Sequence, residues 1–287
     1  MKPPPFEYDD PRRLDEALAL LAEHGAEAKV LAGGQSLVPL LNFRLARPRR
    51  LIDVNGLGEL DYLRFENGTL RIGALTRQAA LERSSETAQR VPLLTRAVRF
   101  VGHPQIRNRG TVGGSVAHAD PAAELPAALS ALDARYRLRT RSGERVVASE
   151  ELFLAARTTA LAPDELLVEV EVDVPGPATG SAFVEFSRRY GGAALAGAAV
   201  LVTLDGSGAC ERARIGLLAA GPTPVRAREA EVWLRGATID AATAAEAGAR
   251  AAAGVTPPGD IHGSSDYRRA LVETMVTRAL LEAVARA

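Results

Sequence analysis

Two glycine-rich segments constrain the fold of this chain more than any other feature. Residues 32–36 read Ala-Gly-Gly-Gln-Ser and residues 111–115 read Thr-Val-Gly-Gly-Ser. Glycine adopts backbone conformations that other residues avoid, and it lets an anion approach the main chain closely. Successive N–H groups can then form an anion-binding concavity, to which a following helix adds its positive N-terminal end. Each segment therefore predicts an anion site or, as an isolated glycine pair commonly does, an ordinary tight turn.

The sequence around the first segment predicts a small α/β unit over residues 1–57. A helix is expected to be capped by Asp10 and ended by Gly25, because apolar residues recur on one face between them. Short buried strands are expected at Ala28–Leu31 and Leu51–Val54. The first glycine-rich segment would then leave the end of a strand and lead into a helix.

The remaining sequence predicts a larger mixed α/β unit and a separate C-terminal domain. Residues 58–175 alternate short strands with helical segments and, with residues 1–57, form the first domain. The proline- and glycine-rich stretch Pro175–Gly180 indicates a boundary. Residues 181–287 then predict an α+β domain with a three-stranded antiparallel sheet and a three-helix bundle. Its expected strands are Phe183–Phe186, Ala198–Leu204 and Arg212–Leu218, and its expected helices are Pro224–Leu234, Asp240–Ala253 and Asp266–Ala285.

Charge and composition exclude several classes of protein. The 35 basic and 35 acidic residues balance, and no basic stripe favours nucleic-acid binding. No run approaches the roughly 20 apolar residues that span a bilayer, and Met1–Phe6 lacks the apolar core of a secretory signal. We therefore expect a cytoplasmic protein. The single cysteine, Cys210, cannot by itself form a disulfide or hold an iron–sulfur cluster.

Common nucleotide and catalytic motifs do not account for the glycine-rich segments. Neither is followed by the Lys-Ser/Thr pair of a P-loop, and neither matches the Gly-x-Gly-x-x-Gly pattern of a Rossmann fold. The four histidines lack metal-ligand spacing, and no activated nucleophile stands out. We therefore expect no catalytic side chain and no metal site. Two such segments, from distant parts of the chain, suit the adjacent negative charges of a diphosphate.

The sequence resembles the FAD-binding subunits of molybdenum-containing hydroxylases, a family that includes the medium subunit of aerobic carbon monoxide dehydrogenase and the flavin domain of xanthine dehydrogenase. The resemblance covers nearly the whole chain. It begins at Pro5–Tyr8 and continues through Leu31–Pro39. It is most specific at Gln105–Ser115, and it extends through Ala119–Pro126.

The resemblance implies that both glycine-rich segments bind the diphosphate of one FAD. It also implies that Glu124 contacts the cofactor and that Leu161 is an apolar neighbour of the flavin. From the residues alone, Glu124 is equally an acid that interacts with a helix dipole, and the residues favour Leu161 as a core residue. The expected cofactor-binding residues are Ala32, Gly33, Gly34, Gln35, Ser36, Leu37, Thr111, Gly113, Gly114, Ser115, Glu124 and Leu161.

The chain departs from the family pattern after Arg188 and Arg189. Many relatives have Gly-Asp followed by an aromatic residue, which in some shields one face of the flavin. Here Gly192 and Ala193 take the aspartate and aromatic positions, and Tyr190 lies three residues before Ala193. The departure affects the expected environment of the flavin but not the diphosphate segments. Arg107 and Arg109, which flank the second segment, could neutralise phosphate, contact a partner subunit or form solvated charges.

The resemblance implies an oxidoreductase subunit that passes electrons from the [2Fe–2S] clusters of a small subunit through FAD to an external acceptor. A large molybdopterin-binding subunit would oxidise the substrate, and the three chains would form a heterotrimer that dimerises. Two alternatives remain open at this point. One is a free-standing FAD oxidoreductase, and the other is a scaffold subunit with weak or lost FAD binding.

Overall fold

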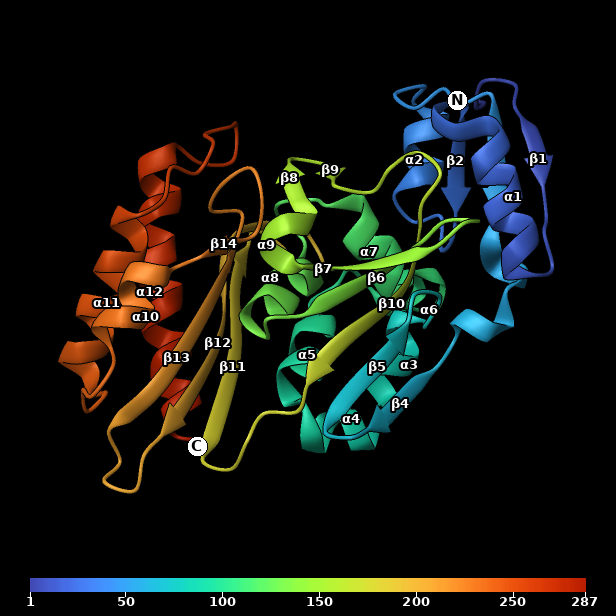
Figure 1. Cartoon of the computed structure of the whole chain (residues 1–287). Helices are drawn as coiled ribbons and strands as arrows, with labels where there is room; N and C mark the ends of the chain where they lie inside the picture. Colours follow the sequence, from blue (N-terminus) through green and yellow to red (C-terminus); the bar gives the residue numbers. More distant parts are fainter.

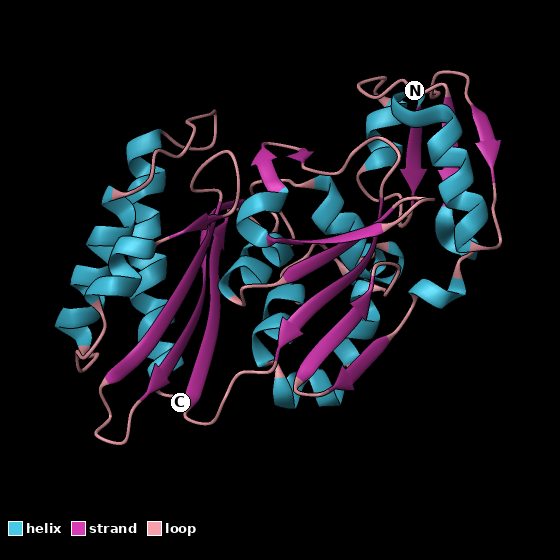
Figure 2. Cartoon of the chain, viewed as in Figure 1, coloured by secondary structure: helices cyan, strands magenta, loops and turns pink.

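The computed structural model describes all 287 residues, which form three modules arranged along the chain (Figure 1). Each module is built around a sheet of its own, and a small two-stranded sheet lies beside the middle one (Figure 2). The fold is therefore mixed α/β, which agrees with the α+β class expected for the whole chain in that it combines helices and sheets. No helix has both the length and the apolar character needed to cross a membrane.

The N-terminal module is a parallel three-stranded sheet in the order β1-β3-β2. Its apolar core includes Leu14, Leu18 and Leu21, which the helical periodicity places on one face. Its elements are β1 (Glu7–Asp9), α1 (Leu14–His24), β2 (Ala28–Leu31), α2 (Leu37–Asn42) and β3 (Arg50–Asp53), with 3-10 turns η1 (Gly25–Glu27), η2 (Val54–Gly56) and η3 (Gly58–Leu60).

The predicted cap of the first helix is wrong. Helix α1 begins at Leu14, so Asp10 lies outside it and pairs instead with Arg12. The carboxylate of Glu16 accepts hydrogen bonds from the backbone N–H groups of Arg12 and Arg13, at 3.0 and 3.3 Å. A glutamate in the first turn of the helix therefore satisfies N–H groups that a capping aspartate would otherwise hold.

The middle module is an antiparallel five-stranded sheet in the order β4-β5-β10-β6-β7, packed against a group of short helices. The central strand β10 is buried along almost its whole length, and its sequence alternates apolar residues with Glu169 and Glu171, which pair with arginines of the neighbouring strands. The strands are β4 (Leu63–Glu66), β5 (Thr69–Gly73), β6 (Arg135–Arg139), β7 (Glu144–Ala148), β8 (Phe153–Ala155), β9 (Thr158–Thr159) and β10 (Leu166–Asp173). The helices are α3 (Gln78–Arg83), α4 (Ser85–Arg90), α5 (Pro92–Val98), α6 (Pro104–Arg109), α7 (Val112–His118), α8 (Glu124–Ala131) and α9 (Ser149–Leu152).

The C-terminal module has four strands rather than the three expected. The additional strand, β14, is only two residues long and pairs at the sheet edge, so it leaves no periodic signal in the sequence. The strands are antiparallel in the order β11-β12-β13-β14. The elements are β11 (Thr179–Ser187), β12 (Ala194–Leu204), β13 (Cys210–Leu218), β14 (Val225–Arg226), α10 (Arg228–Trp233), α11 (Ala241–Ala253) and α12 (Ser265–Val284).

Both faces of the C-terminal sheet are buried. Successive residues of a strand point to opposite faces. On β12, Ala199 and Leu201 therefore join the core shared with the middle module, whereas Ala198 and Val200 join the core beneath the C-terminal helices. Helices α10 and α12 pack on the outer face of this sheet, and α11 packs against α10 and α12 (Figure 1).

Candidate functional site

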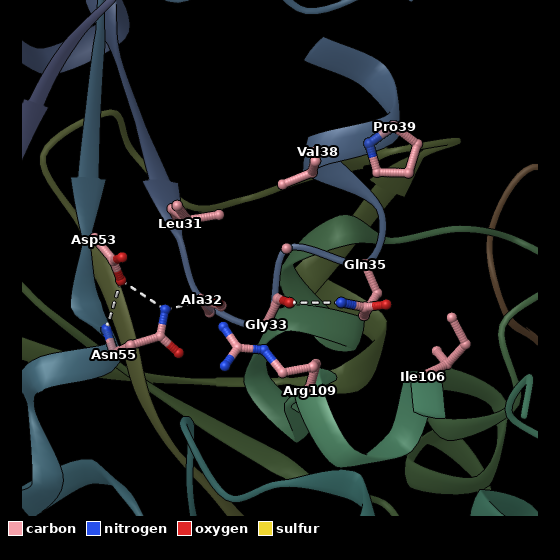
Figure 3. A pocket seen from close by; sticks show the side chains of 11 residues that line it. Leu31, Ala32, Gly33, Gln35, Val38, Pro39, Asp53, Asn55, Ile106 and Arg109 are labelled. Atoms are coloured by element: carbon pink, nitrogen blue, oxygen red, sulfur yellow. Dashed lines mark hydrogen bonds between the residues drawn. The ribbon is translucent and has the colours of Figure 1, made fainter. Parts of the chain in front are cut away.

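A pocket of about 400 Å³ opens along the first glycine-rich segment, between the N-terminal and middle modules (Figure 3). Strand β2 carries the chain into this loop, and α2 carries it away. The end of β3 and helix α6 supply the other walls. The pocket is lined by Leu31, Ala32, Gly33, Gly34, Gln35, Val38, Pro39, Asp53, Asn55, Ile106 and Arg109.

The first glycine-rich loop presents a row of unused backbone donors. The N–H groups of residues 33–37 donate to no acceptor within the protein. Two of the loop's carbonyl groups are held by side chains, because Asn55 Nδ2 donates to the Ala32 oxygen at 2.7 Å and Gln35 Nε2 donates to the Gly33 oxygen at 3.0 Å. Gly34 has a φ of 73°, which favours glycine. Consecutive N–H groups around such a residue make a concavity that suits an anion.

The second glycine-rich segment is not a loop. It is the first turn of α7, and Thr111 caps this turn because its Oγ1 accepts from the Gly114 N–H at 3.0 Å. Val112 and Gly113 donate to the carbonyl oxygens of Thr76 and Ala74, each at 2.9 Å. Ser115 donates to the Thr111 oxygen at 3.1 Å. These backbone N–H groups are thus engaged inside the protein, unlike those of the first segment.

The two segments nevertheless meet. A Cβ atom on Gly33 would overlap the Arg109 carbonyl oxygen and lie 2.8 Å from the Gly110 Cα. A Cβ on Gly114 would lie 3.9 Å from the Cβ of Ala32. Glycine at position 33 therefore allows the first loop to rest directly on the chain that enters the second segment. The fold brings together two segments that the sequence separates widely.

The structure distinguishes the two arginines that flank the second segment. Arg107 is buried, pairs with Glu82 at 2.8 Å and donates to the carbonyl oxygen of Val101 at 3.1 Å, so it serves the fold. The guanidinium of Arg109 has no acceptor within the protein and lies at the pocket, where it extends toward the Ala32 end of the loop (Figure 3). An exposed cation beside unused N–H groups adds to the attraction for an anion.

Asp53 and Asn55 are site residues that our sequence analysis missed. Both follow β3, which runs parallel to β2, so the carboxyl ends of the two strands meet at one edge of the sheet. That edge is where open α/β sheets bind ligands, and it is the signal that could have identified them. Burial favours a higher pKa for Asp53, but hydrogen bonds from Tyr8 and Asn55 hold its pKa below the ordinary value.

Of the expected site residues, only Ala32, Gly33, Gly34 and Gln35 line this pocket. The others do not line it, namely Ser36, Leu37, Thr111, Gly113, Gly114, Ser115, Glu124 and Leu161. Glu124 is the first residue of α8, and burial raises its pKa to about 7. Leu161 is half-buried and packs against the core of the middle module. Ala193 is exposed, and Tyr190 lies next to His103 with 5.8 Å between ring centroids. The geometry thus unites the two glycine-rich segments but does not bring Glu124, Leu161 or Ala193 to the same pocket.

Comparisons with known proteins agree with this architecture. Residues 4–175 match the family described as "FAD binding domain in molybdopterin dehydrogenase", and residues 181–283 match the "CO dehydrogenase flavoprotein C-terminal domain". The chain is 47% identical to the 6-hydroxypseudooxynicotine dehydrogenase complex subunit alpha of Paenarthrobacter nicotinovorans, over 100% of this chain and 97% of that one. It is 29% identical to the xanthine dehydrogenase FAD-binding subunit of Escherichia coli O157:H7, over 98% of this chain and 96% of that one.

Solved structures give the same result. A chain of carbon monoxide dehydrogenase from Hydrogenophaga pseudoflava superposes with a TM-score of 0.97 at 39% identity, over 100% of both chains. A chain of quinoline 2-oxidoreductase from Pseudomonas putida 86 superposes with a TM-score of 0.94 at 38% identity, over 99% of both chains. The match therefore extends over the full length and includes the C-terminal module.

Proposed function

Since the chain belongs to the family of FAD-binding subunits of molybdopterin dehydrogenases, we propose that it holds FAD by the diphosphate, between the first glycine-rich loop and the start of α7. The protein is a flavoprotein and an oxidoreductase subunit of the molybdenum hydroxylase type. The observation that carries the proposed location is the row of unused N–H groups at residues 33–37, beside the free guanidinium of Arg109.

The first loop supplies most of the binding groups in this proposal. Its N–H groups donate to the phosphate oxygens, and Gln35, by holding the Gly33 carbonyl, keeps the donors turned toward them. Arg109 offsets part of the negative charge. Ala32 and Leu37 bound the loop, and the Ser36 hydroxyl is exposed and free to donate.

The second segment contributes mainly shape. Because its backbone donors are engaged, we propose that Gly113 lets α7 lie directly on Ala74, that Gly114 faces Ala32 of the first loop, and that the Ser115 hydroxyl reaches the cofactor. Thr111 holds the turn through its cap. Glu124 and Leu161 are proposed to contact the cofactor beyond the diphosphate, a role that rests on the family resemblance.

Bound FAD supplies the electron-transfer chemistry, and the chain supplies binding, orientation and electrostatic tuning. We propose that electrons arrive from the [2Fe–2S] clusters of a small subunit and leave to an external acceptor. The relatives support this path, since several are named as subunits or medium chains of dehydrogenases. A single cysteine cannot hold such clusters in this chain.

The proposed assembly is a heterotrimer that dimerises, with a molybdopterin-binding large subunit that oxidises the substrate. In this chain we propose two domains, residues 1–175 for FAD and residues 181–287 as a C-terminal flavoprotein domain.

The test of the proposed function is to purify the chain alone and together with its iron–sulfur and molybdopterin partners. Alone, with FAD, it should show at most slow diaphorase activity, in which added NADH supplies the electrons that reduce an artificial acceptor, and it should hydroxylate nothing. Efficient hydroxylation by the isolated chain would favour a free-standing enzyme instead.

One observation supports a second candidate function. The exposed Ala193 stands where many relatives carry an aromatic residue, so the flavin would be less covered there. A scaffold subunit that binds FAD weakly would show this feature. The visible spectrum of the freshly purified complex decides between the candidates, because a scaffold would copurify without flavin bands even when FAD is present in excess.

A further inference from the structure

A chain of side-chain hydrogen bonds joins the two glycine-rich segments along the wall of the pocket, which Asp53 and Asn55 help to line. Asn55 Nδ2 donates to the Ala32 oxygen at 2.7 Å and to Asp53 Oδ1 at 2.6 Å. Asn55 Oδ1 accepts from Arg77 Nη2 at 2.7 Å. The other guanidinium nitrogen, Nη1 of Arg77, donates to the Arg109 oxygen at 2.5 Å. One arginine therefore connects the first loop, through an asparagine, with the chain that enters the second segment.

The orientation of the Asn55 amide is fixed by its neighbours. Its NH₂ group faces two oxygens, and its carbonyl oxygen faces a guanidinium, so a flipped amide would set like groups against each other on both sides. Asp53 is itself held by Tyr8, whose hydroxyl donates to Oδ2 at 2.6 Å. Aspartate at position 55 would fill nearly the same volume but would offer no donor to the Ala32 oxygen.

Arg77 carries a charge that no carboxylate pairs with directly. Its two hydrogen bonds go to neutral oxygens, and it forms no ion pair. The side chain is half-buried on the short link between β5 and α3. Burial lowers its pKa, and the nearby charge of Arg109 lowers it further. Two guanidinium groups are thus placed together, and an anion in the adjacent pocket would relieve their repulsion.

We infer that Arg77 and Asn55 are positioning residues that hold the two glycine-rich segments in the geometry that binds the FAD diphosphate. The inference rests on the proposed location of FAD. Arg77 does not line the pocket and acts only by setting the distance between the segments through its two-pronged contact. Asn55 lines the pocket, and its proposed role is to hold the Ala32 carbonyl and thereby to fix the direction of the loop's N–H groups.

The experiment measures the dissociation constants of FAD and ADP, by isothermal titration of the full chain stripped of flavin. The variants are Arg77→Met, Arg77→Lys, Asn55→Asp and the double variant Arg77→Met/Asn55→Asp. Arg83→Met is the matched control, because Arg83 is exposed and has no ion pair or side-chain hydrogen bond. Binding is measured well below each melting temperature. Substitution of a residue that only stabilises the fold would lower the melting temperature without changing the dissociation constant of the folded protein.

We expect Arg77→Met and Asn55→Asp each to weaken the binding of both FAD and ADP at least tenfold, and the control to bind them as the wild type does. The affinity for ADP should fall by the same factor as the affinity for FAD, because the defect lies at the diphosphate. The double variant should be little weaker than the worse single variant, since both break one connection. The affinity of Arg77→Lys for FAD should lie between those of the wild type and Arg77→Met, because a single ammonium cannot reproduce the two contacts that the guanidinium makes. If Asn55→Asp does not fold, Asn55→Ala takes its place.

Wild-type affinity in folded Arg77→Met and Asn55 variants would overturn the inference, and so would fully additive losses in the double variant. Failure of the proposed location of FAD gives a different pattern. In that case Gly34→Ala, which alters the loop itself, would also leave FAD and ADP binding unchanged.

Discussion

Gly33 rests directly on the backbone of Arg109, so that a Cβ atom at position 33 would overlap the Arg109 carbonyl oxygen. From the sequence, glycine at position 33 is explained by the close approach of an anion to the main chain. In the structure, a side chain at this position would instead push the first loop away from the chain that leads into α7. The two segments are thus one structural unit, and a change in one affects the other.

Gly33→Ala should therefore weaken FAD binding at least tenfold and destabilise the protein by about 1–3 kcal/mol, the usual range for overpacking. Isothermal titration and thermal unfolding check the two effects. Gly58→Ala is the control, because a Cβ at position 58 meets no atom within 4 Å. Equal FAD affinity in the two variants would show that the contact between the segments does not matter for binding.

Arg109→Gln should affect FAD binding, whereas Arg107→Gln should affect the stability of the fold. The first removes a free cation at the pocket, so FAD binding should weaken about threefold to tenfold and become less sensitive to salt, with little change in melting temperature. The second leaves the partly buried Glu82 unpaired, so stability should fall by roughly 1–3 kcal/mol. Titrations at low and high salt, together with thermal unfolding, measure both. The assignment fails if the two variants behave alike.

Ala193→Tyr tests the departure from the family pattern. If this position faces the flavin, an aromatic ring there should cover the flavin and slow FAD release. Aromatic stacking contributes about 0.5–1.5 kcal/mol, which is up to roughly a tenfold change in affinity. Stopped-flow measurement of FAD release and of flavin reoxidation by oxygen checks the effect. A normally folded variant with both rates unchanged would place residue 193 away from the flavin.

Two partly buried glutamates, Glu185 and Glu124, should make the free energy of unfolding fall as the pH rises. Burial, and then the charge of Glu124, raise the pKa of Glu185 to about 8 from its ordinary 4.5, and one of its carboxylate oxygens has no hydrogen-bond partner. The folded state therefore keeps the proton that the unfolded state releases near pH 4.5. The stabilising contribution of the neutral carboxyl is complete below that pH and is lost as the pH rises through about 8.

Glu185→Gln should therefore flatten the pH dependence of stability. The difference in free energy of unfolding between the variant and the wild type should shift in favour of the variant by roughly 1–2 kcal/mol between pH 5 and pH 8.5. The shift is smaller than full burial would give, because the side chain is partly accessible. Thermal or urea unfolding between pH 5 and pH 8.5 provides the measurement. Parallel stability profiles for variant and wild type would show that Glu185 ionises normally in the folded protein.

Local sequence signals predicted much of the fold because they report local physics. Strand β2 lies at Ala28–Leu31 as expected, and α11 (Ala241–Ala253) occupies the helix expected at Asp240–Ala253. Strand β14 and the helical state of the second glycine-rich segment could not be predicted in this way. That helix is anchored by the distant carbonyl groups of Thr76 and Ala74, which only the folded chain brings near.

The candidate site shows the same division. Glycine pairs identified both segments, because glycine is needed where backbones approach closely. The sequence did not show that one segment offers its N–H groups whereas the other uses them internally. Nor did it separate Arg107, which is buried with Glu82, from the free Arg109. These differences depend on contacts between residues far apart in the chain.

The most direct test of the proposed FAD location is to measure bound flavin in two matched glycine variants. Gly34 and Gly68 both have positive φ, of 73° and 78°, so alanine at either position costs about 1–2 kcal/mol of backbone strain. Only Gly34 lies in the proposed diphosphate loop. After reconstitution with FAD and gel filtration, flavin absorbance near 450 nm should give about one FAD per chain for the wild type and Gly68→Ala, a band that belongs to the flavin itself. Gly34→Ala should lose most of its FAD, whereas full retention of FAD by folded Gly34→Ala would contradict binding at this loop.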